Sequence, residues 1–423
     1  MSAAGHREDD EGDGDDNVPD VDPRRAAATL RDAGFVRLVA TADGDALAAV
    51  GLLARALRRL DVPFQASLAA VPTPPTTDAD CTVAVGHPTG DVAIHTAPLA
   101  TTAAAVADAV LAGDADAGGD IDADTDTDTE ADIDTEADTY TADPALALAG
   151  AVCAGAPPAG DRLEAAGLER RPGVAIPTAD PVTGLVGSTL VHAAFSGDEE
   201  ATAAAIEGLA ADPEDGAALA SFVALSAVRD APPRAAEAVE CALRPYDCDR
   251  FETLGGFADV LDAVARRRPG TGIALAIGAD VAEAALDVWR DHGVAVHRAL
   301  RTADTARYDG VFVARLEDAD DGDADIDERD ADADGRDAAT LGAVARLLYA
   351  YRSPEPIALV AADGAAAVTA EVPVEGPFRE ATEELDGSAV VRAGVDPSRG
   401  GFHGTATVEG TASDYVAAFR RAL

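Results

Sequence analysis

Two aspartates separated by one glycine form the most chemically specific segment of the chain. Asp43-Gly44-Asp45 follows an apolar run at 35–40 that is typical of a buried strand, and it precedes an apolar helical pattern at 46–60. Two carboxylates at the end of a strand can share metal ions, and a pair of ions can clamp phosphate oxygens and generate a hydroxide. Oxygen ligands of this kind suit Mn²⁺ or Mg²⁺. The alternative is that Asp43 only caps the helix that follows it.

Two histidines and a glycine-rich segment are further candidates. His87 and His95 lie at the ends of predicted strands, where each is either a relocated metal ligand or an ordinary polar residue of a loop. Near the C-terminus a glycine-rich turn surrounds one histidine. Its backbone N–H groups and imidazole are candidates for binding a phosphate, at Gly400, Gly401, His403 and Gly404.

Two arginine clusters are the densest positive charge in the sequence. They are Arg170-Arg171 and Arg266-Arg267-Arg268, and both are candidates for nucleic-acid contact because guanidinium groups bind phosphate in a bidentate manner. The second cluster also ends a predicted helix, where positive charge complements the helix dipole.

The charge balance of the whole chain is extreme. Its 423 residues include 78 acidic and 32 basic side chains, for a formal net charge of −46, and every basic residue is Arg because Lys is absent. In molar salt the Debye length is about 3 Å, so dense surface carboxylates repel one another weakly. The composition therefore predicts a halophilic, cytoplasmic protein and says little about its partners. An acidic N-terminus and the lack of a long uninterrupted apolar stretch predict no membrane association.

Three segments are rich in acidic residues and poor in large apolar ones. We expect residues 1–24 to be a disordered tail, and 114–143 and 317–337 to be exposed insertions. Asp330–Gly335 matches the first half of an EF-hand loop, but the position that should supply a bidentate Glu is Leu341, so a solvated loop is favoured over a calcium site.

Between these tracts, strands alternate with helices, which predicts an α/β fold with a mostly parallel N-terminal sheet. Short strands are expected at 35–40, 64–70, 82–86 and 92–95, with helices at 46–60 and 101–111. A helical connector follows. The second α/β pattern has helices at 255–268, 281–292, 338–351 and 412–423, and strands at 273–277, 294–299, 310–315, 356–362, 366–372 and 388–393.

The run Ala42–Ala49 resembles the first motif of the DHH phosphoesterases, the family that includes the RecJ exonucleases. The segments 171–178 and 195–198 are similar to the middle of archaeal RecJ-like proteins, and Arg399–Ala406 resembles the glycine-histidine motif of the DHH-associated domain. The resemblance implies a DHH-type α/β domain at 25–198, a helical connector at 199–250 and a smaller C-terminal α/β DHH-associated domain at 251–423.

Several positions depart from the motifs of the enzymes in that family. The resemblance implies a histidine at Val39 and metal-binding aspartates near Gly86, His95 and Cys153, and none of these four positions has the expected residue. It therefore implies a centre of which only Asp43 and Asp45 remain, with Mn²⁺ or Mg²⁺ bound weakly or with no cofactor at all.

The function implied by this resemblance is a RecJ-like protein of DNA replication or repair that has lost catalysis. It would act as a scaffold associated with replication proteins such as GINS or MCM, or bind single-stranded nucleic acid without cutting it. The alternative is an active Mn²⁺-dependent exonuclease in which Asp43, Asp45, His87 and His95 supply the catalytic site.

Overall fold

The computed structural model describes residues 21–72, 78–116, 141–209, 215–316, 338–396 and 400–423. The acidic tail up to residue 20, most of the first acidic insertion, all of the second and the EF-hand-like segment lie outside these residues, so the predictions made for them stay predictions. Among the described helices, none combines the length and the apolar character needed to cross a membrane.

The N-terminal sheet has four strands in the order β2-β1-β3-β4, and all three pairings are parallel. The strands are β1 (Val36–Thr41), β2 (Phe64–Ala69), β3 (Cys81–Val85) and β4 (Val92–Ile94). The predicted parallel sheet is thereby confirmed. The central strand β1 is buried along its whole length, as expected for a strand covered on both faces.

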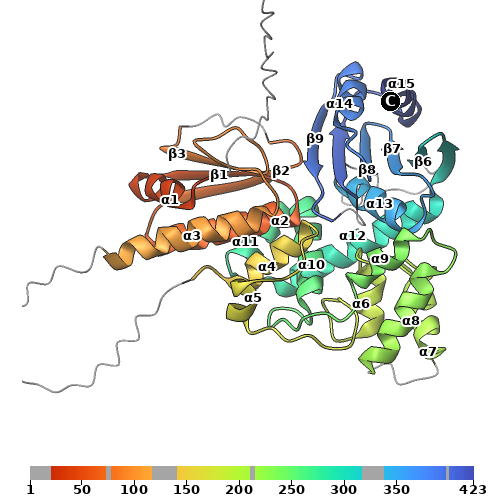
Figure 1. Cartoon of the computed structure of the whole chain (residues 1–423), viewed down its shortest axis with the longest axis horizontal. Coiled ribbons are helices and arrows are strands. Elements are labelled where there is room, and N and C mark those ends of the chain that lie inside the picture. The colour runs from red at the N-terminus through yellow and green to blue at the C-terminus, as the bar shows by residue number, and fades with distance from the viewer. Residues whose placement is uncertain (1–20, 73–77, 117–140, 210–214, 317–337, 397–399) are drawn as a thin grey trace, which may run out of the picture.

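Helices pack against this sheet and against one another. They are α1 (Pro23–Asp32), α2 (Gly44–Arg59), α3 (Leu99–Asp116) and α4 (Pro144–Cys153). Helix α3 packs on both α1 and α2, and Figure 1 shows it running below the orange sheet. Helix α1 was not anticipated from the sequence, although Asp22 caps it and a proline begins it.

The middle of the chain is helical, as predicted for the connector at 199–250, whereas the two helices at 161–187 were not predicted. It contains α5 (Asp161–Ala166), α6 (Pro181–Gly187), α7 (Glu199–Glu207), α8 (Gly216–Val228) and α9 (Arg234–Glu240). Helices α6 to α9 lie at the lower right of Figure 1, below the second sheet, and α5 lies below α4.

Two predicted strands of the second α/β pattern are wrong. Helix α10 (Leu254–Arg267) occurs as expected, but 273–277 lies in helix α11 (Pro269–Ala276) and the residue that ends it, and 294–299 lies within helix α12 (Ala282–Thr302). In α12 the buried side chains of Trp289, Val296 and Leu300 recur at the spacing of one helical face. A short apolar run taken alone does not distinguish this pattern from a buried strand.

The second sheet has six strands in the order β5-β6-β7-β8-β10-β9, and only the β6–β7 pairing is parallel. The strands are β5 (Asp304–Tyr308), β6 (Val311–Leu316), β7 (Ile357–Ala362), β8 (Ala365–Ala370), β9 (Ser388–Ala393) and β10 (Phe402–Thr407). Helix α13 (Ala338–Tyr351) covers one face, and α14 (Glu375–Glu384) and α15 (Ala412–Ala422) cover the other. Strands β5 and β10 were not predicted.

The described residues form three hydrophobic clusters. The first contains β1, α2, α3 and α4 together with side chains of α10 and α11, and Trp289 of α12. The second joins α6 to α9 with the later part of α12, α13 and one face of the second sheet, and the third lies on the opposite face of that sheet. Helix α10 therefore shares a core with β1, and the domain division at residue 251 stays a prediction.

Candidate functional site

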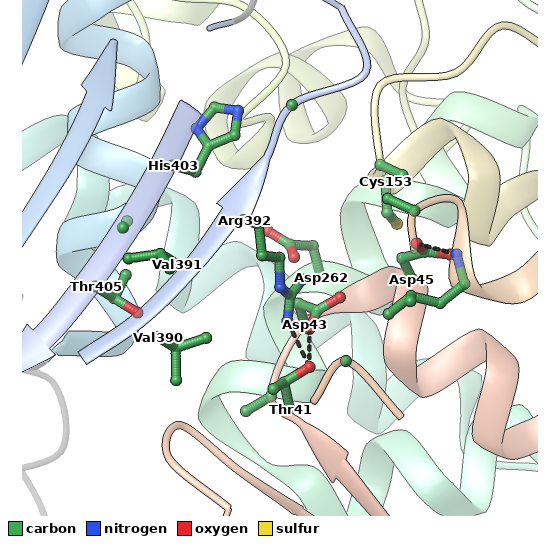
Figure 2. A pocket seen from close by; sticks show the side chains of 18 of the residues that line it. Thr41, Asp43, Asp45, Cys153, Asp262, Val390, Val391, Arg392, His403 and Thr405 are labelled. Carbon is green, nitrogen blue, oxygen red and sulfur yellow. Dashed lines mark hydrogen bonds and ion pairs between the residues drawn. The ribbon is translucent and has the colours of Figure 1, made fainter. Parts of the chain in front are cut away.

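A cavity of about 670 Å³ lies where the carboxyl end of the first sheet faces the second sheet. The β1–α2 turn and α10 line it on one side and β9 and β10 on the other (Figure 2), and residues of α13 and β8 complete the lining. Its charged and imidazole-bearing lining residues are Asp43, Asp45, His95, Asp262, Arg266, Arg346, Arg392, Asp396 and His403.

Asp43 is a buried helix cap that also forms an ion pair. Its Oδ1 accepts a hydrogen bond from the backbone N–H of Ala46 at 3.0 Å, which confirms the capping role at α2. Its Oδ2 accepts from the Thr41 hydroxyl at 2.8 Å and from Nη2 of Arg392. Burial works to raise the pKa of Asp43, but the Arg392 guanidinium, with the Ala46 amide and Arg266, outweighs it and holds that pKa below its ordinary value. Asp43 is therefore ionised and already neutralised by a protein cation.

The Asp45 carboxylate is directed at the start of another helix. Its two oxygens accept the backbone N–H groups of Leu99 at 2.7 Å and Ala100 at 2.8 Å, at the first residues of α3. In Figure 2 it lies apart from Asp43. Burial, followed by the negative charge of Asp43, raises the pKa of Asp45 to about 7. Both oxygens thus serve to cap α3.

A third buried carboxylate, Asp262 on α10, was not identified from the sequence. It accepts hydrogen bonds from the backbone N–H of Gly44 at 3.1 Å and from Nε and Nη2 of Arg266 at 3.1 and 3.0 Å. Nη1 of Arg346 on α13 lies 3.5 Å from its Oδ2. Burial works to raise the pKa of Asp262, but these two arginines lower it overall. The spacing of Asp262 and Arg266 by four residues on a helix was a signal available in the sequence.

The residues present do not fit a metal centre of the two-ion type. Among the described residues, no group of three or more His, Cys, Asp and Glu side chains is placed to hold a metal ion. The oxygens of Asp43 accept from Thr41, Ala46 and Arg392, and those of Asp45 accept from two helical amides. A metal-ligand role for Asp43 and Asp45 stays a prediction.

Three of the four positions that the resemblance marked as altered lie at this same cavity, and Val39 does not. Gly86, His95 and Cys153 all line it. The buried Nδ1 of His95 has no hydrogen-bond partner among the described residues. His87 is outside the lining, and its Nε2 lies 3.2 Å from the carbonyl oxygen of Val39. The structure thus brings His95, but not His87, to Asp43 and Asp45.

The C-terminal glycine-histidine segment reaches the cavity too, although not as the predicted turn. His403 and Gly404 belong to strand β10, and together with Gly400 they line the cavity, whereas Gly401 does not. Nδ1 of His403 lies 3.2 Å from the Thr369 hydroxyl of β8. The segment is a strand because it pairs with β8 on one side and β9 on the other.

Of the five arginines predicted to contact nucleic acid, only Arg266 lines the cavity. Arg170 stacks over the Tyr246 ring, and Arg171 forms ion pairs with Asp247 and Glu252. Arg267 donates to the Thr340 hydroxyl at 3.4 Å, and Arg268 donates to the carbonyl oxygen of Arg267 at 3.2 Å. The other cavity arginines, Arg346 and Arg392, come from segments that the sequence did not mark.

The chain belongs to the family of the uncharacterised protein rrnAC1427 of Haloarcula marismortui. The two sequences are 41% identical over 97% of this chain and 99% of that protein. The model of the rrnAC1427 C-terminal domain matches residues 303–421, which contain the whole second sheet.

Among solved structures, RecJ exonucleases are similar to this chain. RecJ of Thermus thermophilus in complex with Mg²⁺ has a TM-score of 0.45 and 14% identity, covering 94% of this chain and 52% of RecJ. The same protein with Mn²⁺ also has a TM-score of 0.45 and 14% identity, covering 94% and 54%. An exonuclease RecJ bound to manganese has a TM-score of 0.46 and 14% identity, covering 96% and 94%. The chain spans about half the length of the Thermus thermophilus RecJ.

Proposed function

We propose that this protein is a RecJ-like member of the DHH class that binds single-stranded nucleic acid at the cavity without hydrolysing it. The observation that carries the proposal is the contact of Arg392 with both Asp43 and Thr41. It places a permanent cation against the carboxylate that a hydrolytic centre would need for a metal ion.

The shape and chemistry of the cavity support a nucleotide-sized ligand. A volume of about 670 Å³ falls in the range of about 300–1,000 Å³ typical of sites for small molecules and cofactors. Arg266, Arg346 and Arg392 supply planar donors suited to phosphate. Charges that are partly buried are screened less by salt than surface charges. The cavity therefore combines the space and the guanidinium donors that a phosphate-bearing ligand needs in molar salt.

Digestion and binding of 5′-labelled single strands in molar KCl with Mn²⁺ test this proposal. We expect the strands to remain intact while their fluorescence anisotropy rises with protein concentration. We also expect Arg346→Gln to weaken binding at least about tenfold because it removes one guanidinium from the cavity wall. Arg379→Gln, at an exposed ion pair on α14, is the matched control and should bind as the wild type does.

Hydrolysis of the strands would contradict the proposal, and the same assay detects it. Shortening of the strands that disappears in Asp45→Ala would establish the Mn²⁺-dependent exonuclease instead. Because Asp45 caps α3, that variant needs a circular dichroism spectrum to show that it is folded. Asp43→Asn provides a second test, since Asn is itself a good helix cap and keeps the acceptor for the Ala46 amide while it removes the charge and the oxygen that faces Arg392.

The RecJ-like assignment also includes a role in replication or repair within the cytoplasm, as a scaffold for partners such as GINS or MCM. Affinity purification of the full chain from cells of its own source in molar salt tests this part. Recovery of GINS or MCM subunits would support it. Their absence, with intact single-strand binding, would limit the role to nucleic-acid binding.

A further inference from the structure

Arg392 is held in place by one nitrogen, and its other donors remain for a ligand. Its Nη2 donates to Asp43 and Thr41, and among the described residues no hydrogen bond involves its Nε or Nη1. The side chain is 29% exposed and lines the cavity. Asp43 and Thr41 thus orient a guanidinium that still has unused N–H groups.

Arg266 has the same arrangement on the wall formed by α10. Its Nε and Nη2 both donate to Asp262, and among the described residues its Nη1 makes no hydrogen bond. The side chain is 17% exposed and lines the same cavity. Two arginines from distant segments are therefore each held by a buried carboxylate, and each has N–H groups that make no hydrogen bond within the described residues.

The two guanidiniums are close enough for their charges to interact. Repulsion by Arg266 works to lower the pKa of Arg392, and both arginines work to lower the pKa of Asp43. An anion placed between them would lower this repulsion and accept the donors that the carboxylates leave unused. A divalent cation at the same place would meet carboxylates that are already paired with arginines, and it would have to displace Arg392 to reach Asp43.

We propose that Arg392 and Arg266 replace metal ions in this cavity and bind a phosphate group directly, so that ligand binding needs no divalent cation. The inference rests on the proposed function in that both place the ligand in the same cavity. It adds the chemical class of the bound group, a phosphate, and the cations that hold it.

Calorimetric titration of inorganic phosphate into the full chain in molar KCl with EDTA tests the proposal. We expect binding in EDTA, with a Kd that changes less than about twofold when EDTA is replaced by Mn²⁺. We expect Arg392→Gln to weaken it at least about tenfold, since charge-assisted donors to phosphate are lost, and Arg379→Gln to leave it unchanged. Binding seen only with Mn²⁺, or unaltered in Arg392→Gln, would overturn the inference.

Mn²⁺ binding measured by electron paramagnetic resonance gives a readout that does not depend on phosphate. The acidic surface will hold some Mn²⁺ in every variant, so the comparison is between wild type and Asp43→Asn. Equal numbers of bound ions are expected because Arg392, and not a metal, neutralises Asp43. Loss of one bound Mn²⁺ in Asp43→Asn would contradict the inference.

The outcomes separate the inference from the proposed function. Phosphate binding in EDTA without single-strand binding would support the arginine site and reject the nucleic-acid role. Single-strand binding that requires Mn²⁺ would support the nucleic-acid role and reject the arginine site. Thermal unfolding of each variant identifies a loss of binding that is caused by misfolding, and Arg392→Lys, which keeps the charge, then replaces Arg392→Gln as the test variant.

Discussion

Arg392 lies 349 residues after Asp43 in the chain, yet the two side chains form an ion pair in the lining of the cavity. The sequence identified Asp43 and Asp45 because they share one short motif after a strand, and it marked Arg266 because three arginines are adjacent. It did not identify Asp262, Arg346 or Arg392. Each of these is a single residue in an ordinary helix or strand, and one sequence contains no record of which distant residues meet.

A second buried carboxylate of α10 organises the region behind the cavity. Asp259 is 3% exposed, and its Oδ2 accepts from Nε1 of Trp289 at 2.8 Å and from the backbone N–H of Thr189 at 3.0 Å. Its Oδ1 accepts from the Thr189 hydroxyl at 2.6 Å. That hydroxyl also accepts from Arg346, so Asp259 helps to position a guanidinium of the cavity.

We expect Asp259→Ala to lower the free energy of unfolding by at least about 3 kcal/mol, since it leaves buried donors without an acceptor at about 1–3 kcal/mol each. Asp259→Asn should cost less than about 1 kcal/mol. Its amide oxygen can accept from Trp289 and from the Thr189 amide, and its nitrogen can donate to the Thr189 hydroxyl. Thermal unfolding in molar KCl measures the stability of both variants. An equal loss of unfolding free energy in the two would contradict a role for the hydrogen bonds of Asp259.

At the scale of elements, the sequence predicted best where helices and strands alternate regularly. Strands β1 to β4 and helix α2 were recognised because Val- and Ala-rich runs are separated by longer amphipathic segments. Helices α11 and α12 were partly taken for strands because each contains a short apolar run, at 273–277 and at 294–296. Over about five or six residues, such a run fits a buried strand as well as part of a helix. Strand β10 was taken for a turn because its glycines suggested one, whereas β8 and β9 hold it as a strand.

Helices α12 and α6 cross at a pair of glycines. A Cβ added to Gly293 of α12 would lie 2.0 Å from the carbonyl oxygen of Gly187 in α6 and 2.5 Å from its carbonyl carbon. These are backbone atoms, which no side-chain rotation can move away. The close approach also brings α6 onto Trp289, whose ring lies against Gly187.

Gly293→Ala should therefore destabilise the protein by about 2 kcal/mol, the usual cost of overpacking a buried contact. Gly270→Ala on α11 is the matched control, because an added Cβ there meets nothing within 4 Å. That change should raise stability by up to about 1 kcal/mol through helix propensity. Melting curves recorded by circular dichroism distinguish the two, and a neutral Gly293→Ala would show that the helices can separate without cost.

At the scale of the whole molecule, the cavity depends on how separate cores are joined. Trp289 near the start of α12 lies in the first core, while Val296 and Leu300 further along the same helix lie in the second. One continuous helix thus connects the sheet that supplies Asp43 with the region that supplies Arg346 and Arg392. The sequence predicted the two α/β patterns but not this connection, because it divided α12 into a helix and a strand.

The net charge of −46 makes the stability of the whole chain dependent on salt. Lowering KCl from about 1 M to about 0.1 M lengthens the Debye length from about 3 Å to about 10 Å, so surface carboxylates repel one another over a longer range. We expect Tm to fall steadily across this series and to recover when NaCl restores the ionic strength. A Tm that does not change with salt would contradict the expected halophilic character.

Trp289 is the only tryptophan of the chain, and it is fully buried where α6, α10 and α12 meet. Its ultraviolet emission therefore comes from a single location, beside the carboxylate that positions a cavity arginine. An intrinsic fluorophore at that junction reports the opening of the interior without any label, in native protein and at any ionic strength.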